Sequence, residues 1–128
     1  MAHARAHIGE THYRVAIKAG HHELVADEHV EMGGKDVGPA PYELLLSALG
    51  ACTAITLKMY AERKQWPLTE VDVGLLFTRE GDRGKIARML TLEGDLDSEQ
   101  RARLADIAER TPVTLTLKAG VDIHTELR

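Results

Sequence analysis

The stretch of residues 41–60 constrains the fold of this chain most, because it is a long apolar run and holds the only cysteine, Cys52. A helix that is apolar around its whole circumference cannot lie on a surface. We therefore expect a buried helix, wrapped by other elements of the chain or by a second copy of it. Between residues 44 and 57 the only polar side chains, apart from the thiol, are three hydroxyls: Ser47, Thr53 and Thr56.

Proline marks both ends of this expected helix. Pro41 suits the first helical position, where a missing N–H costs nothing, and Trp66-Pro67 stops the helix. The pattern predicts about 22 residues, or about 33 Å of rise. The uninterrupted apolar part is about 14 residues, against the roughly 20 that a membrane span needs, so we expect no membrane insertion.

Small residues recur along one side of the same stretch, at spacings of three or four positions. Such spacing allows another backbone to approach closely. Two interpretations stay open: a helix crossing inside one subunit, or the same helix of a twin subunit packing antiparallel in a shared core. The small residues are Ser47, Gly50, Ala51 and Ala54.

Composition restricts the class of protein. With 128 residues, 44% hydrophobic, 28% charged and a net charge of -4, the chain is expected to be one soluble domain over residues 1–128, without a basic surface for nucleic acid. A single cysteine excludes an internal disulfide and suits a reducing compartment, and the first residues lack a signal peptide's apolar core. We therefore expect a cytoplasmic protein.

The seven histidines do not form a metal-binding pattern. His3 and His7 are expected in a mobile tail, His21-His22 in a turn, and His12, His29 and His124 on separate strands. None belongs to a Cys/His or Glu-x-x-His constellation, and no glycine-rich phosphate fingerprint occurs. We expect neither a metal nor another cofactor.

The rest of the chain alternates in the manner of hairpins. Residues 11–19 and 22–30 predict one hairpin, and residues 71–77 and 86–92 a second, with a loop of about five residues at 80–84. Hairpins, instead of repeated strand-helix-strand units, favour an antiparallel α+β fold.

Two further helices and a strand are expected near the end. Asp97 with Gln100 forms a capping-box pattern before an amphipathic helix, and Thr111-Pro112 predicts the start of a short helix. Residues 121–127 alternate again and predict a closing strand.

Several segments together resemble the OsmC/Ohr family (osmotically inducible protein C, organic hydroperoxide resistance). They follow the family's order over nearly the whole chain. The segments are GPAPYELLL (38–46), ALGACT (48–53), MYA (59–61), KQWPL (64–68), LEGDL (92–96) and AERTPV (108–113).

The resemblance implies an α+β homodimer in which antiparallel sheets from both subunits wrap two long central helices. Many members reduce organic hydroperoxides with two cysteines. The first, at the position of Cys52, attacks the peroxide as a thiolate and becomes a sulfenic acid. The second resolves it as a disulfide, which small dithiols or lipoyl proteins then reduce.

This chain departs from that pattern at two places. Thr111 stands where the resolving cysteine is expected, and Tyr42 stands where the peroxidases carry a glutamate, with Glu43 one residue later. Nine residues of helix, about 13 Å, separate Glu43 from Cys52, so Glu43 would act at the partner subunit's sulfur or through an intermediary, or simply favour the helix N-terminus. The family's strand arginine stays unplaced among Arg14, Arg79, Arg83 and Arg88.

Two functions follow from these features. The first is thiol-dependent reduction of an organic hydroperoxide through Cys52, with an external thiol in place of the second cysteine. The alternative is a non-catalytic dimeric member that binds a small apolar ligand, in which Cys52 is merely a small core hydrophobe.

Overall fold

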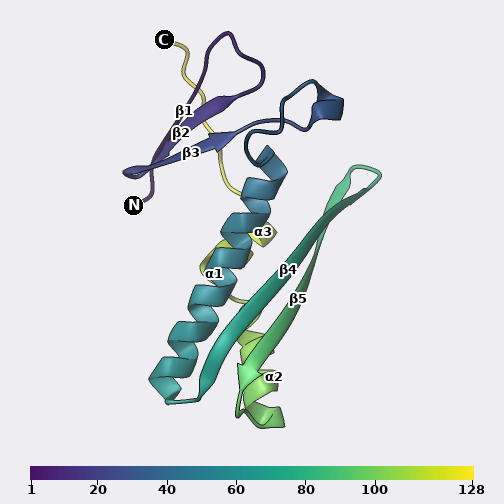
Figure 1. Cartoon of the computed structure of the whole chain (residues 1–128). Coiled ribbons are helices and arrows are strands. Elements are labelled where there is room, and N and C mark those ends of the chain that lie inside the picture. The colour runs from purple at the N-terminus through teal and green to yellow at the C-terminus, as the bar shows by residue number, and fades with distance from the viewer. The chain divides into compact units, whose positions relative to one another are not determined.

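The computed structural model describes residues 1–128 and has the predicted α+β composition, with antiparallel sheets. It forms two compact units, residues 1–45 and 46–128. The elements are labelled in Figure 1 and run in the order β1 (Ala4–Ile8), β2 (Val15–Ala19), β3 (His22–Ala26), η1 (Val30–Met32), α1 (Pro41–Lys64), β4 (Leu68–Glu80), β5 (Arg83–Gly94), α2 (Ser98–Ala108) and α3 (Pro112–Ala119).

The first unit contains a three-stranded antiparallel sheet in the order β1-β2-β3. Its first strand was not predicted: His7, expected in a mobile tail, lies in β1 opposite Ala16. The expected hairpin exists, but its strands are shorter than predicted. His12 lies in a turn before β2, and His29 lies beyond the end of β3, so neither is on a strand.

Asp27 ends β3 early because its carboxylate satisfies backbone groups that a longer strand would have paired. The side chain is buried, and Oδ1 accepts the N–H groups of Tyr13 (3.2 Å) and Glu28 (2.7 Å). Oδ2 accepts those of Lys35 (3.1 Å) and Val37 (3.2 Å). Burial raises the pKa of Asp27, but these four N–H groups outweigh it and hold the pKa below its ordinary value.

Helix α1 has 24 residues, Pro41–Lys64, which confirms the predicted long helix. It stops where expected. Gln65 adopts a left-handed conformation (φ 58°), and the N–H of Trp66 bonds to the carbonyl of Ala61 at 2.8 Å, which satisfies the last turn.

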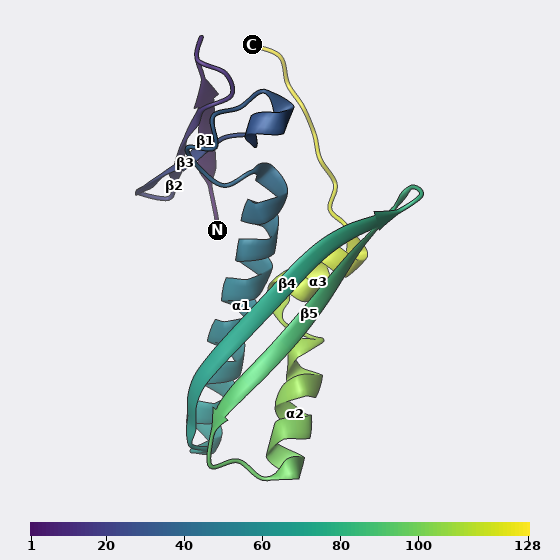
Figure 2. The same ribbon diagram turned by 45° about the vertical axis from the view of Figure 1, so that its right-hand side comes forward.

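The second unit is built on the β4–β5 ribbon, which Figures 1 and 2 show lying across α1 and α2. The predicted five-residue loop is wrong: Gly81 and Asp82 alone connect the strands, and Gly81 supplies the positive φ (60°) that such a tight turn requires. Alternate residues of both strands are half-buried, including the cross-strand pairs Val71↔Leu92 and Val73↔Leu90.

The core of this unit forms where α1, β4 and α2 meet. Its buried residues are Leu57, Ala61, Leu68, Leu104 and Ala108. Both predicted helix starts are confirmed. The Asp97 carboxylate accepts the Gln100 N–H in a complete capping box, and the Thr111 hydroxyl accepts the Thr114 N–H ahead of α3.

The predicted closing strand at residues 121–127 does not form in this chain. The segment is fully exposed and pairs with no other strand, although its apolar residues alternate as a strand's would. A strand needs a neighbour for its N–H and C=O groups, and this segment has none within one chain. Val121, Ile123 and Leu127 are 64%, 82% and 99% exposed.

Helix α1 is long and apolar enough to cross a membrane, by length and composition alone. One such helix is weak evidence for a membrane span, because the core helix of a soluble protein meets the same criteria. Whether this helix lies in a membrane or in a protein core therefore depends on which elements pack against it.

Candidate functional site

Cys52 lies in the middle of α1 and is half-buried. Its Sγ lies 3.9 Å from the hydroxyl oxygen of Thr56, one turn further along the helix. The two side chains share a face because residues four apart stack on a helix. The hydroxyl can therefore donate to the sulfur.

Cys52 lies between two different faces of α1. One face is buried within the chain and consists of Leu49, Thr53, Leu57 and Ala61. The opposite face, which we call the bare face, consists of Ala48, Ala51, Ile55 and Met59, all exposed. The sulfur thus lies at the border between a packed core and an uncovered apolar surface.

Gly50, one of the small residues on α1, faces strand β4, which neither sequence interpretation foresaw. A Cβ added to Gly50 would lie 2.8 Å from Cδ1 of Leu75, so a side chain of β4 occupies the space that Gly50 leaves open. The close approach at Gly50 is therefore between a helix and a strand of the same chain.

Arg88, on β5, connects α1 to the turn between α2 and α3. Its Nη1 donates to the hydroxyls of Thr53 (3.0 Å) and Thr114 (2.9 Å). Its Nη2 donates to the Ala108 carbonyl (2.8 Å) and to the Glu109 carboxylate (3.3 Å). With its side chain only 11% exposed, this guanidinium is a polar link in the core that donates to four acceptors.

One of the four arginines that the sequence left open, Arg88, makes a hydrogen bond to α1. It reaches α1 at Thr53, the residue after Cys52, and its bond is to the hydroxyl instead of the sulfur. The sequence held one signal for this link: Thr53 is spaced with Leu49 and Leu57 on one helix face, and a buried hydroxyl needs a partner.

Thr111, the position expected for a resolving cysteine, is buried at the start of α3. Its Oγ1 lies 2.6 Å from Oγ1 of Thr114, which in turn accepts from Arg88. Hydrogen bonds therefore connect position 111, through Thr114 and Arg88, to the residue next to Cys52. The Lys118 ammonium, with Arg88 adding to it, holds the pKa of Glu109 below its ordinary value.

Glu43 lies in the first turn of α1 and makes a capping contact. Its Oε1 accepts the Ala40 N–H at 2.9 Å and lies 3.4 Å from Nε2 of His29. First the Ala40 N–H and then His29 hold the pKa of Glu43 below its ordinary value. This geometry favours the structural interpretation of Glu43, a carboxylate that satisfies the helix N-terminus.

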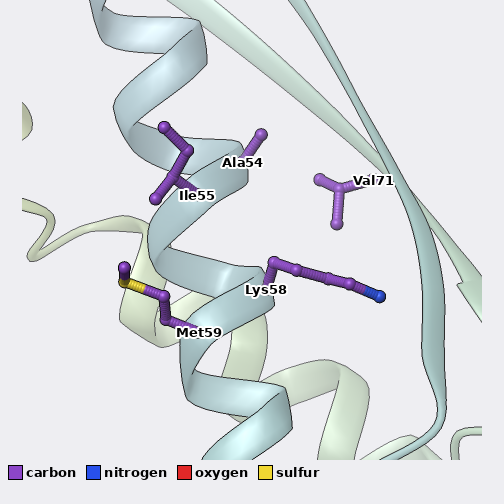
Figure 3. A pocket seen from close by; sticks show the side chains of 5 residues that line it. All are labelled: Ala54, Ile55, Lys58, Met59 and Val71. Atoms are coloured by element: carbon purple, nitrogen blue, oxygen red, sulfur yellow. The ribbon is translucent and has the colours of Figure 1, made fainter.

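A shallow apolar groove of about 330 Å³ lies between α1 and β4 in the second unit. Its lining consists of Ala54, Ile55, Lys58 and Met59 from α1 and Val71 from β4; Figure 3 shows Ala54 and Lys58 pointing toward Val71, with Ile55 and Met59 on the other side of the helix. Lys58 extends across the groove, and its ammonium donates to the carbonyl of Leu68. The groove suits a small apolar molecule in size and lining.

Nowhere in the chain do three or more His, Cys, Asp or Glu side chains lie together in a way that could hold a metal ion.

The model of the OsmC-like protein family matches residues 33–126, which include Cys52, Arg88 and Thr111. The chain belongs to this family. No protein with a curated description matches it significantly.

Solved structures agree with this family assignment at the level of the fold. The OsmC-like protein of Mycoplasma pneumoniae superposes with a TM-score of 0.79 at 17% identity, over 92% of this chain and 87% of that one. An organic hydroperoxide resistance protein OsmC of Legionella pneumophila gives 0.65 at 22%, over 95% and 92%. The organic hydroperoxide resistance protein OhrB of Bacillus subtilis gives 0.64 at 21%, over 100% and 98%.

Proposed function

We propose that this OsmC-like protein reduces organic hydroperoxides through Cys52, with an external thiol as reductant. The observation that carries the proposal is the position of the sulfur: half-buried, beside a hydroxyl, and at the edge of an exposed apolar face. An alkyl group can pack at this border while its peroxide reaches the sulfur. Membership of a family that includes organic hydroperoxide resistance proteins supports the same chemistry.

The reaction balances with one protein thiol. The Cys52 thiolate attacks the distal oxygen of ROOH, the O–O bond breaks, and the products are Cys52 sulfenic acid and ROH after protonation of the alkoxide. A small thiol then displaces water from the sulfenic acid and forms a mixed disulfide. A second thiol releases the small-molecule disulfide and restores Cys52.

We also propose that the working form is a homodimer. Ile55 and Met59 are 55% and 54% exposed, on a helix face with no charged residue between Ala48 and Leu57. Large uncovered apolar surfaces mark interfaces. The unpaired segment 121–127, with apolar side chains at alternate positions, offers a second surface for the same partner, because an added copy could supply the missing neighbour strand.

The proposed reaction predicts steady consumption of cumene hydroperoxide when dithiothreitol is the only reductant. The control is Cys52→Ser, which keeps the size of the side chain and removes the nucleophile. We expect the rate with this variant to fall to that of dithiothreitol alone. Equal rates for the wild type and the variant would refute catalysis by Cys52.

The groove in Figure 3 supports a second candidate function, the binding of a small apolar molecule without chemistry. Ala54→Leu would fill the groove from the helix side, whereas Cys52→Ser would leave it open. Loss of binding of a fluorescent apolar probe in the first variant only, together with no peroxide consumption by the wild type, would favour this function.

We expect the protein to work in the cytoplasm, where reducing conditions keep a single thiol reduced and small thiols are abundant.

A further inference from the structure

The ring of His29 lies between two carboxylates in the first unit. Its Nδ1 is 3.6 Å from Oε1 of Glu31, and its Nε2 is 3.4 Å from Oε1 of Glu43. The side chain of His29 is 41% exposed. The charged groups that face the ring are Glu31 from η1, Asp36 from the following loop and Glu43 from α1.

This geometry favours one charge state of the imidazole. A neutral ring carries a single N–H, so one of its nitrogens would direct a lone pair at a carboxylate oxygen. Only the imidazolium ion can donate on both sides. The hydrogen bond and charge of Glu43, with Glu31 and Asp36 adding to them, raise the pKa of His29.

The backbone of His29 also organises the η1 turn. Its carbonyl accepts the N–H groups of Met32 (2.9 Å) and Gly34 (3.1 Å). None of the three residues of η1 is buried, and Val30 and Met32 are 67% and 65% exposed, so little apolar packing holds the turn in place. The side-chain contacts of His29 therefore matter more here than an exposed ion pair usually does.

We propose that His29, Glu31 and Glu43 form a pH-dependent switch that fixes the η1 turn to the start of α1 while His29 carries both ring protons. When one proton is lost, one of the two carboxylate contacts breaks and the turn is released. This switch is independent of the proposed thiol reaction, because neither Cys52 nor a peroxide takes part in it.

The pH range of the switch follows from the directions in which the pKa values of His29 and Glu43 are shifted. A histidine whose pKa is raised on folding contributes stability below its unfolded value, and this stability is lost as the pH rises through the folded value. A glutamate whose pKa is lowered contributes stability that is lost as the pH falls through its folded value. The η1 turn should thus be fixed at pH values between the folded-state pKa of Glu43 and that of His29, and released above the pKa of His29.

Nuclear magnetic resonance on the full-length labelled protein can test the switch. The ring signals of His29 report its titration, and amide exchange, corrected for its intrinsic pH dependence, reports the stability of the turn at Met32, Gly33 and Gly34. We expect His29 to titrate above the ordinary pKa of a histidine side chain, and the three amides to lose protection several-fold with the same midpoint. Titration of His29 at or below that ordinary value, or amide protection that does not change as His29 titrates, would overturn the proposal.

Three variants separate a switch from a merely structural contact. Glu43→Gln should lower the midpoint of His29, and His29→Lys should keep the turn protected through the whole range, because lysine stays charged. His22→Gln, at the exposed start of β3, is the matched control and should change nothing. A His29→Lys protein that still loses protection at the wild-type midpoint would contradict the switch.

Discussion

The two faces of helix α1 have similar apolar sequences but different surroundings. The face with Leu49, Thr53 and Leu57 is buried within the chain, whereas the bare face with Ile55 and Met59 is exposed. Composition alone demands cover on both sides. One chain covers only one of the two faces, and Cys52 lies where this cover ends. The proposed dimer and access to the thiol would therefore depend on the same border.

The largest effect is expected on the covered face. Leu57 is fully buried against Leu68, Leu104 and Ala108, so Leu57→Ala would leave a cavity and cost about 2 to 5 kcal/mol. Urea denaturation measures this loss. If Leu57→Ala lowers the free energy of unfolding no more than a substitution at an exposed position does, this face is not packed as described.

The close approach at Gly50 gives the next largest effect. Gly50→Leu would place a side chain against Leu75 of β4, and such overpacking costs about 1 to 3 kcal/mol. Ser47→Ala is the matched change on the same stripe at an exposed position and should cost less than Gly50→Leu. Equal melting temperatures for the two variants would remove the argument for close approach.

Thr111→Cys has a moderate effect on stability and a larger one on chemistry. It removes the hydroxyl contact with Thr114, which is worth about 0.5 to 1.5 kcal/mol. After treatment with cumene hydroperoxide, mass spectrometry should show loss of two hydrogens, the mark of a disulfide with Cys52, instead of added oxygen. An oxygenated product identical to that of the wild type would place position 111 out of reach of Cys52.

The bare face should give the smallest effect on the fold of one chain. Ile55 is 55% exposed, so Ile55→Asp should change the packing within a chain little. It would place a charge in the proposed dimer interface, where an unpaired buried charge is strongly unfavourable. Sedimentation should show a dimer for the wild type and a folded monomer for the variant. A wild type that stays monomeric at high micromolar concentration would refute the shared interface.

The sequence predicts the helices better than the strands. Proline, capping residues and apolar periodicity are local signals, and they place α1, α2 and α3 correctly. β1 was missed because Ala4–Ile8 is wholly exposed and because its alternation with Arg5 and His7 is carried mostly by alanine, which favours strands weakly. The end of β3 was misplaced because the Asp27 carboxylate binds N–H groups up to 14 residues away, which no local pattern reveals.

The candidate site was predicted in part. Cys52 and Thr111 follow from the resemblance, but the contacts of Arg88 and His29 come from distant segments and required the structure. Arg88 meets Thr53 from 35 residues away, and His29 meets Glu43 from 14 residues away. The strand predicted at 121–127 does not form within one chain for a related reason. Alternation of apolar residues indicates a face suited to packing, but it does not indicate which segment would pack on that face.

The reaction of Cys52 with a peroxide in a single turnover tests the central claim most directly. Reduced protein is mixed with cumene hydroperoxide without added thiol, and the mass of the intact chain is followed with time. We predict the addition of one oxygen at Cys52, faster than for free cysteine at the same pH, without a disulfide-linked dimer, and reversal by dithiothreitol. A Cys52 that gains no oxygen, or reacts no faster than free cysteine, would contradict the proposed peroxidase.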